Sequence, residues 1–242
     1  MTRGRAGRGW TPETRRDGAL IGVLLFAGFA LQTAGLLWTT PSRAAFLTGL
    51  SVILVPVIGL FLGRPLRWGP AAGSLLAAAG LWVLYRPEAS GSDIGGFGRG
   101  DALTIACAVV FAVYVIVLEG ATRRNAMGPL AVVQFGVVAA LALPSLVLDP
   151  PAMPSGRAVF AVIVLGVFAT AAAFVAQLYA QRHLSAVETG VILTLEPVIA
   201  SAFSVLLGVE PWTAALALGG FLILAAMLVT ELGGGAADPS PS

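Results

Sequence analysis

Apolar runs long enough to cross a lipid bilayer occupy most of this chain, and they constrain its fold more than any other feature. A transmembrane helix needs about 17–25 mostly apolar residues, and eight runs of that length can be read from the sequence. They cover residues 19–37, 44–62, 69–85, 101–118, 129–148, 158–179, 185–207 and 213–230. Only 11% of the 242 residues are charged, against about 25% in soluble domains. The sequence therefore predicts an all-α fold, a polytopic membrane helix bundle with eight transmembrane helices.

The segments outside these runs define the predicted organisation of the chain. Residues 1–18 hold five of the 14 arginines and are predicted to form an Arg-rich cytoplasmic segment. Residues 86–100 form the predicted connecting loop, and residues 232–242 a disordered tail. Eight spans place both termini on one side, and a cytoplasmic N-terminus puts ten arginines inside and four outside, as the positive-inside rule favours. We therefore expect a multi-pass protein of the inner (plasma) membrane with both termini in the cytoplasm.

Few residues in the chain are suited to catalysis or to metal binding. Cys107 and His183 are the single residues of their kinds, so neither a cysteine cluster nor a histidine pair is available to hold a metal. The sequence contains no phosphate-binding glycine loop and no nucleophile elbow. We expect no cofactor, no metal and no enzymatic activity, with a membrane-embedded enzyme as the least favoured class. The arginine cluster suits a membrane flank better than nucleic acid, so the expected partners are the lipid bilayer and a small-molecule substrate.

Two of the apolar runs carry near copies of one sequence. Residues 48–58 read TGLSVILVPVI and residues 189–199 read TGVILTLEPVI, with six identical positions at an offset of 141. The copies lie in the second and seventh runs, and because these places differ by an odd number, the copies must cross the membrane in opposite directions. Helices 1–3 thereby match helices 6–8 as an incomplete inverted repeat, in which helices 4 and 5 have no partners. Such repeats are typical of secondary transporters.

The stretch from Val187 to Ile199, followed by Leu206-Leu-Gly208 and Trp212, resembles the last two helices of EamA-type permeases of the drug/metabolite transporter superfamily. The stretch from Pro41 to Pro65 is similar to the matching part of that family's first half. This resemblance implies a first EamA-like repeat of three helices at 19–85 and a second of five helices at 101–231. Because such permeases have ten helices in two inverted halves, the chain is expected to lack the first two.

The resemblance also implies a function. It points to a permease that moves a small metabolite or drug-like molecule across the inner membrane by alternating access, with export favoured over import. The sequence shows no ATP-binding motif, so a gradient of the substrate or of protons would drive transport. The short first half leaves a second hypothesis, a truncated non-transporting fragment or partner subunit that needs oligomerisation, for example as a homodimer.

Glu196 is the clearest candidate for chemistry within the membrane. It lies at the midpoint of the run 185–207, where the first copy has Val55, and an acid at the bilayer centre costs about 2.5–3.5 kcal/mol on insertion scales. One hypothesis is that Glu196 faces the translocation cavity and binds a proton or a cationic group of the substrate. The alternative is that it bonds backbone groups freed by Pro197. Pro197 and Pro56 each remove a helical hydrogen bond, so each either lines the pathway or forms a packing kink.

Other polar side chains complete the predicted pathway. Thr189 lies seven residues before Glu196 and shares its helix face, and Thr48 is the counterpart of Thr189 in the first copy. Glu188 is rotated by about 80° from Glu196 and lies near the cytoplasmic end, where a solvated acid is ordinary. Gln177 of the sixth run and Tyr114 of the fourth run are added, because a polar side chain within a membrane helix either contacts substrate or bonds to another helix. The candidates are thus Glu196, Pro197, Thr189, Thr48, Pro56, Gln177, Tyr114 and Glu188.

The third run carries a face of small residues. Gly69, Gly73 and Ala77 are spaced four apart, so they lie on one side of a helix. Small residues let two helix backbones approach closely in a membrane. We therefore predict that this run packs tightly against another helix.

Overall fold

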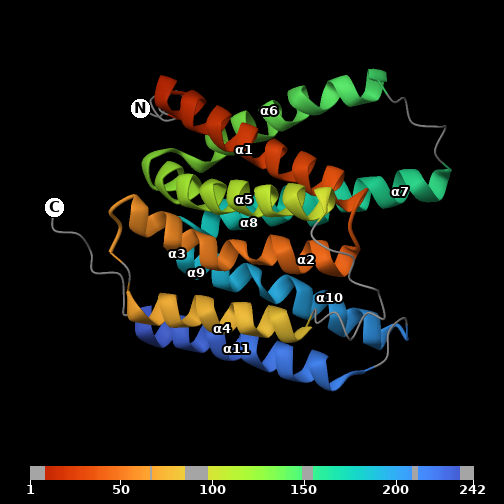
Figure 1. Ribbon diagram of the computed structural model, residues 1–242. Helices are drawn as coiled ribbons and strands as arrows, with labels where there is room; N and C mark the ends of the chain where they lie inside the picture. The colour runs from red at the N-terminus through yellow and green to blue at the C-terminus, as the bar shows by residue number, and fades with distance from the viewer. Residues whose placement is uncertain (1–8, 66, 85–97, 149–154, 209–211, 235–242) are drawn as a thin grey trace. The chain divides into compact units, whose positions relative to one another are not determined.

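The described part of the protein is helical throughout. The structure, a computed structural model, describes residues 9–65, 67–84, 98–148, 155–208 and 212–234, and no strand occurs in these ranges. This confirms the predicted all-α membrane bundle. The elements are α1 (Pro12–Leu36), α2 (Pro41–Gly49), α3 (Ser51–Phe61), α4 (Trp68–Leu84), α5 (Arg99–Arg124), α6 (Met127–Leu148), α7 (Gly156–Val164), η2 (Leu165–Ala172), α8 (Ala173–Ala180), α9 (Ala186–Leu193), α10 (Leu195–Leu206) and α11 (Ala214–Gly234) (Figure 1).

Parts of three predicted segments lie outside the described residues. They are the Arg-rich N-terminal segment up to position 8, the connecting loop 86–100 up to position 97, and the predicted tail from position 235. Among the described residues, five helices are long and apolar enough to cross a membrane. They are Pro12–Leu36, Arg43–Phe61, Arg99–Arg124, Met127–Ser145 and Gly156–Ala180. The apolar helices Trp68–Leu84 and Ala214–Thr230 are shorter, and the paired α9 and α10 occupy the remaining predicted run.

α1 and α5 extend furthest beyond the apolar runs predicted for them. α1 starts at Pro12 rather than at residue 19, because the Thr11 hydroxyl accepts a hydrogen bond of 3.1 Å from the backbone N–H of Thr14 and proline suits the first helical position. α5 continues past residue 118, and on this extension Glu119 and Arg123 form an ion pair of 3.1 Å one turn apart. Polar residues that lie outside the apolar runs thus prolong both helices.

Three predicted spans are interrupted. In the second, α2 and α3 meet at Leu50, and in the seventh, α9 and α10 meet at Thr194. In the sixth, the π-helical η2 joins α7 to α8. The turn at Leu50 is tightened because its N–H is shared between the carbonyls of Phe46 and Leu47, at 3.2 and 3.3 Å. Pro56 lies inside α3, so the interruption of the first copy is not at its proline.

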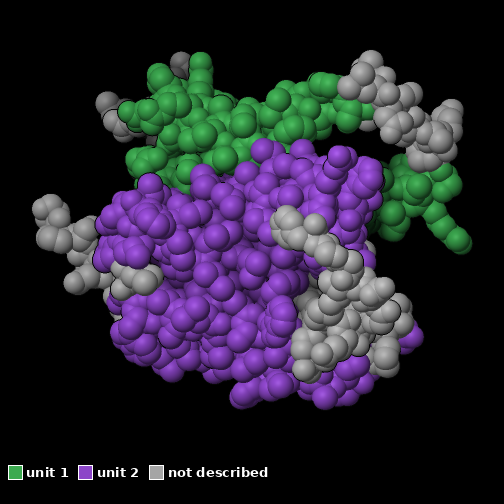
Figure 2. All heavy atoms as spheres, in the orientation of Figure 1, with its two compact units in different colours: residues 1–26, 117–184 green, residues 27–116, 185–242 purple. Residues whose placement is uncertain are grey.

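The chain divides into two compact units, which Figure 2 shows in different colours. Unit 1 comprises residues 1–26 and 117–184, and unit 2 comprises residues 27–116 and 185–242. The division falls within α1 and within α5, so each of these helices belongs to both units. Both units take residues from both predicted repeats, and the repeat boundaries drawn from the sequence stay a prediction.

In unit 1 the first part of α1 approaches α6 through two glycines. A methyl group at Gly18 would lie 2.7 Å from Cβ of Val133, and one at Gly22 would lie 2.8 Å from the carbonyl oxygen of Gln134. Neither a Cβ atom nor a carbonyl oxygen can move aside without moving its helix, so only glycine permits this approach. The spacing of four residues places both glycines on one face of α1.

In unit 2, α4 and α11 run antiparallel in close contact. Gly69 lies against Gly233 and Gly73 lies against Thr230, while Ala77 is fully buried in the same interface region. The predicted packing face of the third run is therefore confirmed. The buried core beside it draws on both copies of the repeated sequence and consists of Val52, Ala77, Leu81, Val191, Ile223 and Ala226.

The segments α2–α3 and α9–α10 have equal lengths and run in opposite directions (Figure 1). Thr40 caps α2, and Gly63, with a φ of 75°, follows 23 positions later. Ser185 caps α9, and Gly208, with a φ of 70°, also follows 23 positions later. The ends of the two segments are therefore offset by 145 residues, whereas the repeated sequence is offset by 141. The copies thus differ by four residues, about one helical turn, in their position along these segments.

Candidate functional site

The seventh span is broken near its middle, next to the strongest candidates. The N–H and the hydroxyl of Thr194 both bond to the carbonyl of Val191, at 3.1 and 2.6 Å. Pro197 has no N–H, so the carbonyl of Leu193 loses its usual helical donor. A tightened turn at Thr194 is the local consequence, and α10 begins directly after it with Glu196 in its first turn.

Glu196 is exposed, and its carboxylate has no hydrogen-bond or ion-pair partner in the described part of the chain. The alternative role, bonding backbone groups freed by Pro197, therefore has no contact to support it. The first turn of a helix is the positive end of its dipole, which favours a negative side chain there. Glu196 is consequently unengaged and chemically available to a proton or a cation.

Glu188 and Thr189 have local partners at the start of α9. The Ser185 hydroxyl accepts a hydrogen bond of 3.2 Å from the Glu188 N–H, and a Glu188 carboxylate oxygen accepts one of 2.7 Å from the Ser185 N–H. This reciprocal pair is a capping box, which supplies two helix-end donors with acceptors. The Thr189 hydroxyl donates to the Ser185 carbonyl at 2.9 Å. Both side chains thus help to start the helix.

The other candidates are distributed over both units. In unit 2, the buried Thr48 hydroxyl lies beside the Cys107 thiol of α5, Pro56 is buried inside α3, and Tyr114 is buried on α5. Gln177 is half-buried on α8 and belongs to unit 1. Unit 2 therefore holds the candidates of both repeat copies.

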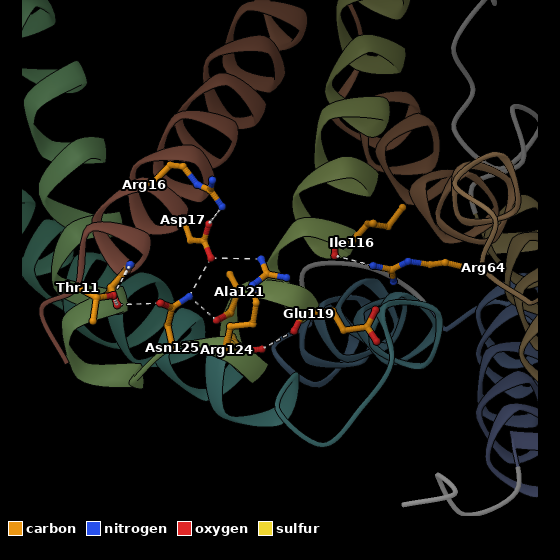
Figure 3. A network of polar contacts seen from close by, with 11 residues as sticks. Thr11, Arg16, Asp17, Arg64, Ile116, Glu119, Ala121, Arg124 and Asn125 are labelled. Atoms are coloured by element: carbon orange, nitrogen blue, oxygen red, sulfur yellow. Dashed lines mark hydrogen bonds and ion pairs between the residues drawn. The ribbon is translucent and has the colours of Figure 1, made fainter. Parts of the chain in front are cut away.

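Sequence reasoning missed a polar network in unit 1, which Figure 3 shows. The buried Asp17 carboxylate accepts hydrogen bonds from Asn125 at 2.9 Å, Arg124 at 3.2 Å and Arg16 at 3.3 Å. The Asn125 side chain also donates to the Ala121 carbonyl at 3.0 Å, and its own oxygen accepts from the Thr14 hydroxyl at 2.8 Å. The network joins the beginning of α1 to the end of α5.

A second buried aspartate lies at the other end of α5, in unit 2. Asp101 accepts hydrogen bonds from the Thr39 hydroxyl at 3.0 Å and from the Gly98 N–H at 2.9 Å, and it forms an ion pair of 2.8 Å with Arg43. Thr39 follows the end of α1, Arg43 lies in the first turn of α2, and Gly98 directly precedes α5. The available sequence signal was an acid placed at the boundary of an apolar run, a feature that both Asp17 and Asp101 share.

Comparison with known proteins finds a transporter family and two similar proteins, one named as a transporter and one as an exporter. The model of the EamA-like transporter family matches residues 98–232. An "Uncharacterized transporter" of Archaeoglobus fulgidus is 31% identical over 219 residues, which cover 90% of this chain and 69% of that protein. An "Aromatic amino acid exporter YddG" of Ancylobacter novellus is 30% identical over 233 residues, which cover 92% of this chain and 76% of that protein.

A solved crystal structure is also similar to the chain. It matches with a TM-score of 0.73 and 25% sequence identity, over 91% of this chain and 86% of that one. The likeness therefore extends over nearly the whole helical arrangement.

Proposed function

The chain belongs to the EamA-like transporter family, and we propose that it exports a small metabolite or drug-like molecule across the inner membrane by alternating access. The exporter named among its relatives makes aromatic amino acids the first substrates to test and supports the outward direction. The proposal rests on a difference between two contacts that the repeat copies make within unit 2: one contact is packed, and its inverted counterpart is not.

One contact between the copies is buried. Val52 and Val55 of α3 are only 1% and 2% exposed. A methyl group at Gly190 of α9 would lie 3.9 Å from Cα of Val52 and 3.8 Å from Cγ2 of Val55, which are ordinary van der Waals distances. The second half of the first copy therefore packs against the first half of the second copy, and α9 also packs against α4.

The inversely related contact is not packed in the same way. At the sequence offset of 141, the residues that correspond to the two valines are Leu193, which is 42% exposed, and Glu196, which is also exposed. Gly49, equivalent to the glycine of α9, faces α4 instead, since a methyl group there would lie 2.7 Å from Cδ1 of Leu81. Within the described residues, α2 and α10 do not pack together as α3 and α9 do.

Unequal contacts between inverted copies are what alternating access requires. When one contact is closed and its inverted counterpart is open, a site between the copies is accessible from one side only, and exchanging the contacts reverses the access. With the predicted orientation, the packed contact is in the cytoplasmic half of the membrane, and α10, with Glu196 in its first turn, occupies the outer half. The ammonium group of an amino acid is a cation that an unengaged carboxylate can bind.

Two cysteine pairs test this proposal in a Cys107→Ala background. Val52→Cys with Gly190→Cys reports on the packed contact, and Gly49→Cys with Leu193→Cys reports on its counterpart. Mild oxidation of membrane vesicles should crosslink the first pair in most molecules and the second in few, because a disulfide requires close Cβ atoms. Saturating tryptophan should change the ratio of the two crosslinks.

Transport by the same variants completes the test. Each crosslink should stop tryptophan efflux from proteoliposomes, and a reductant should restore it, while the single-cysteine variants should transport before and after oxidation. Unchanged efflux from protein whose first pair is fully crosslinked would contradict alternating access through these contacts.

A further inference from the structure

We propose that Arg16 and Arg124 form a binding site for the phosphate of an anionic phospholipid headgroup. The two side chains come from the beginning of α1 and the end of α5 and meet at one buried acid in unit 1 (Figure 3). Nη2 of Arg16 lies 3.3 Å from Oδ1 of Asp17, and Nη2 of Arg124 lies 3.2 Å from Oδ2. The arginine side chains nevertheless remain 78% and 63% exposed.

The Asp17 carboxylate holds both guanidinium groups in place and leaves their other N–H donors available to a ligand. Each guanidinium has five N–H donors in a planar fork, and the contact to Asp17 uses one terminal nitrogen of each. One negative charge faces two positive charges, so the group of three keeps a net positive charge. The remaining exposed donors suit a phosphate, which arginine recognises through several parallel hydrogen bonds.

Buried hydrogen bonds fix the position of the Asp17 carboxylate. Asn125 donates to Oδ2 of Asp17 and is itself held by the Thr14 hydroxyl and the Ala121 carbonyl. Because these contacts are buried, the carboxylate cannot swing away with either arginine. The two guanidinium groups are therefore organised before any ligand arrives, which lowers the entropic cost of binding.

The location favours a lipid phosphate. The apolar run of α1 begins two residues after Asp17, and the apolar run of α5 ends directly before Glu119. The pair of arginines thus lies at the polar end of two membrane helices, where headgroups are found, and basic sites between transmembrane helices bind such headgroups. The exposed Trp10 precedes α1, and tryptophan favours the same headgroup region.

Other basic residues lie at this end of unit 1, together with the exposed acid Glu13. Arg15 and Arg182 are exposed, and Arg123 is paired with Glu119. The sequence adds Arg3, Arg5 and Arg8 before the helix. Diffuse attraction by these residues would depend on total charge alone, whereas the proposed site depends on the two arginines that share Asp17. This difference makes the inference testable, and it rests on membrane location rather than on the transport activity.

The experiment uses the purified full chain in detergent micelles and titrates phosphatidylglycerol or phosphatidylcholine, with bound lipid counted by native mass spectrometry. Phosphatidylglycerol should bind more tightly than phosphatidylcholine. Arg16→Gln and Arg124→Gln should each weaken its binding by about tenfold, as expected for loss of a charge-assisted hydrogen-bond donor. Arg15→Gln is the matched control, because it removes one exposed charge from the same helix without touching Asp17, and it should change binding by less than about twofold.

Two results would overturn the inference. Equal weakening by Arg15→Gln and Arg16→Gln would mean diffuse attraction, and displacement of phosphatidylglycerol by millimolar inorganic phosphate would mean a site for free phosphate. Arg16→Lys keeps the charge but loses the fork, so partial binding by this variant supports the site. Circular dichroism of each variant establishes that a loss of binding is not a loss of fold.

Discussion

Asn125 donates a hydrogen bond of 2.9 Å to the buried carboxylate of Asp17, across 108 positions of sequence. The contact connects the first turns of α1 with the last turn of α5. Asp101 makes a corresponding connection at the opposite end of α5, with Thr39 and Arg43. Buried aspartates therefore attach both ends of α5 to other segments of the chain.

Asn125→Ala should lower the free energy of unfolding by about 1–3 kcal/mol, because it removes one of the three donors to the buried Asp17 carboxylate and the acceptor of the Thr14 hydroxyl. Thermal unfolding in detergent, followed by circular dichroism, measures the loss. Asn125→Asp should be at least as damaging, since it places a second negative charge beside Asp17. A wild-type melting curve for Asn125→Asp would show that the network is not formed.

Gly73→Ala should destabilise the protein by about 1–3 kcal/mol, because the added methyl group would collide with the Thr230 hydroxyl and force α4 away from α11. Gly136→Ala is the matched control on α6, where a methyl group has no neighbour within 4 Å. That substitution should be neutral or stabilising by about 0.5–1 kcal/mol through helix propensity. Similar unfolding curves for the two variants would refute the close contact of α4 and α11.

Glu196→Gln should reduce tryptophan efflux from proteoliposomes to the level of empty liposomes, because it removes the unengaged carboxylate proposed to bind a proton or the substrate's ammonium group. Glu188→Gln makes the same chemical change eight residues earlier. It should leave efflux intact, since glutamine also completes a capping box with Ser185. Full, still pH-dependent efflux by Glu196→Gln would rule out the proton-carrier role.

Asp101→Asn should cost about 1.5–3 kcal/mol of stability, because the buried oxygen that pairs with Arg43 at 2.8 Å loses its charge. Arg99→Gln lies in the same first turn of α5 and is exposed, so it should change stability by less than about 0.5 kcal/mol. Urea or thermal unfolding in detergent compares the two. Equal stability of both variants would mean that the Arg43 contact contributes nothing.

Features that depend on local spacing could be predicted from the sequence. The apolar runs gave the helices, and the spacing of Gly69, Gly73 and Ala77 identified the packing face of α4. The capping box was readable as well, since Ser185 is followed three residues later by Glu188, although it was not recognised. Local rules operate within a few turns of helix, and these features lie within that range.

Features that depend on distant partners could not be predicted. No spacing rule connects Asp17 with Asn125, and one sequence provides no covariation to suggest the pair. The prolines also did not indicate where the helix of the first copy is interrupted, since the tightened turn lies at Leu50 while Pro56 remains inside α3. Gln177 was selected by polarity alone, and its place in a transport pathway stays a prediction.

The equal lengths of α2–α3 and α9–α10 have a consequence for how the two copies diverged. A shift of four residues rotates a helical position by only about 40° and moves it by about 6 Å along the axis. A duplicated motif can therefore slide by one turn while its apolar side chains still face the core. Glu196 therefore has the same position between Ser185 and Gly208 as Ser51 has between Thr40 and Gly63. The repeated sequence aligns Glu196 with Val55 instead. Sliding by whole turns gives a gene duplication a route to unequal halves that preserves the packing of both.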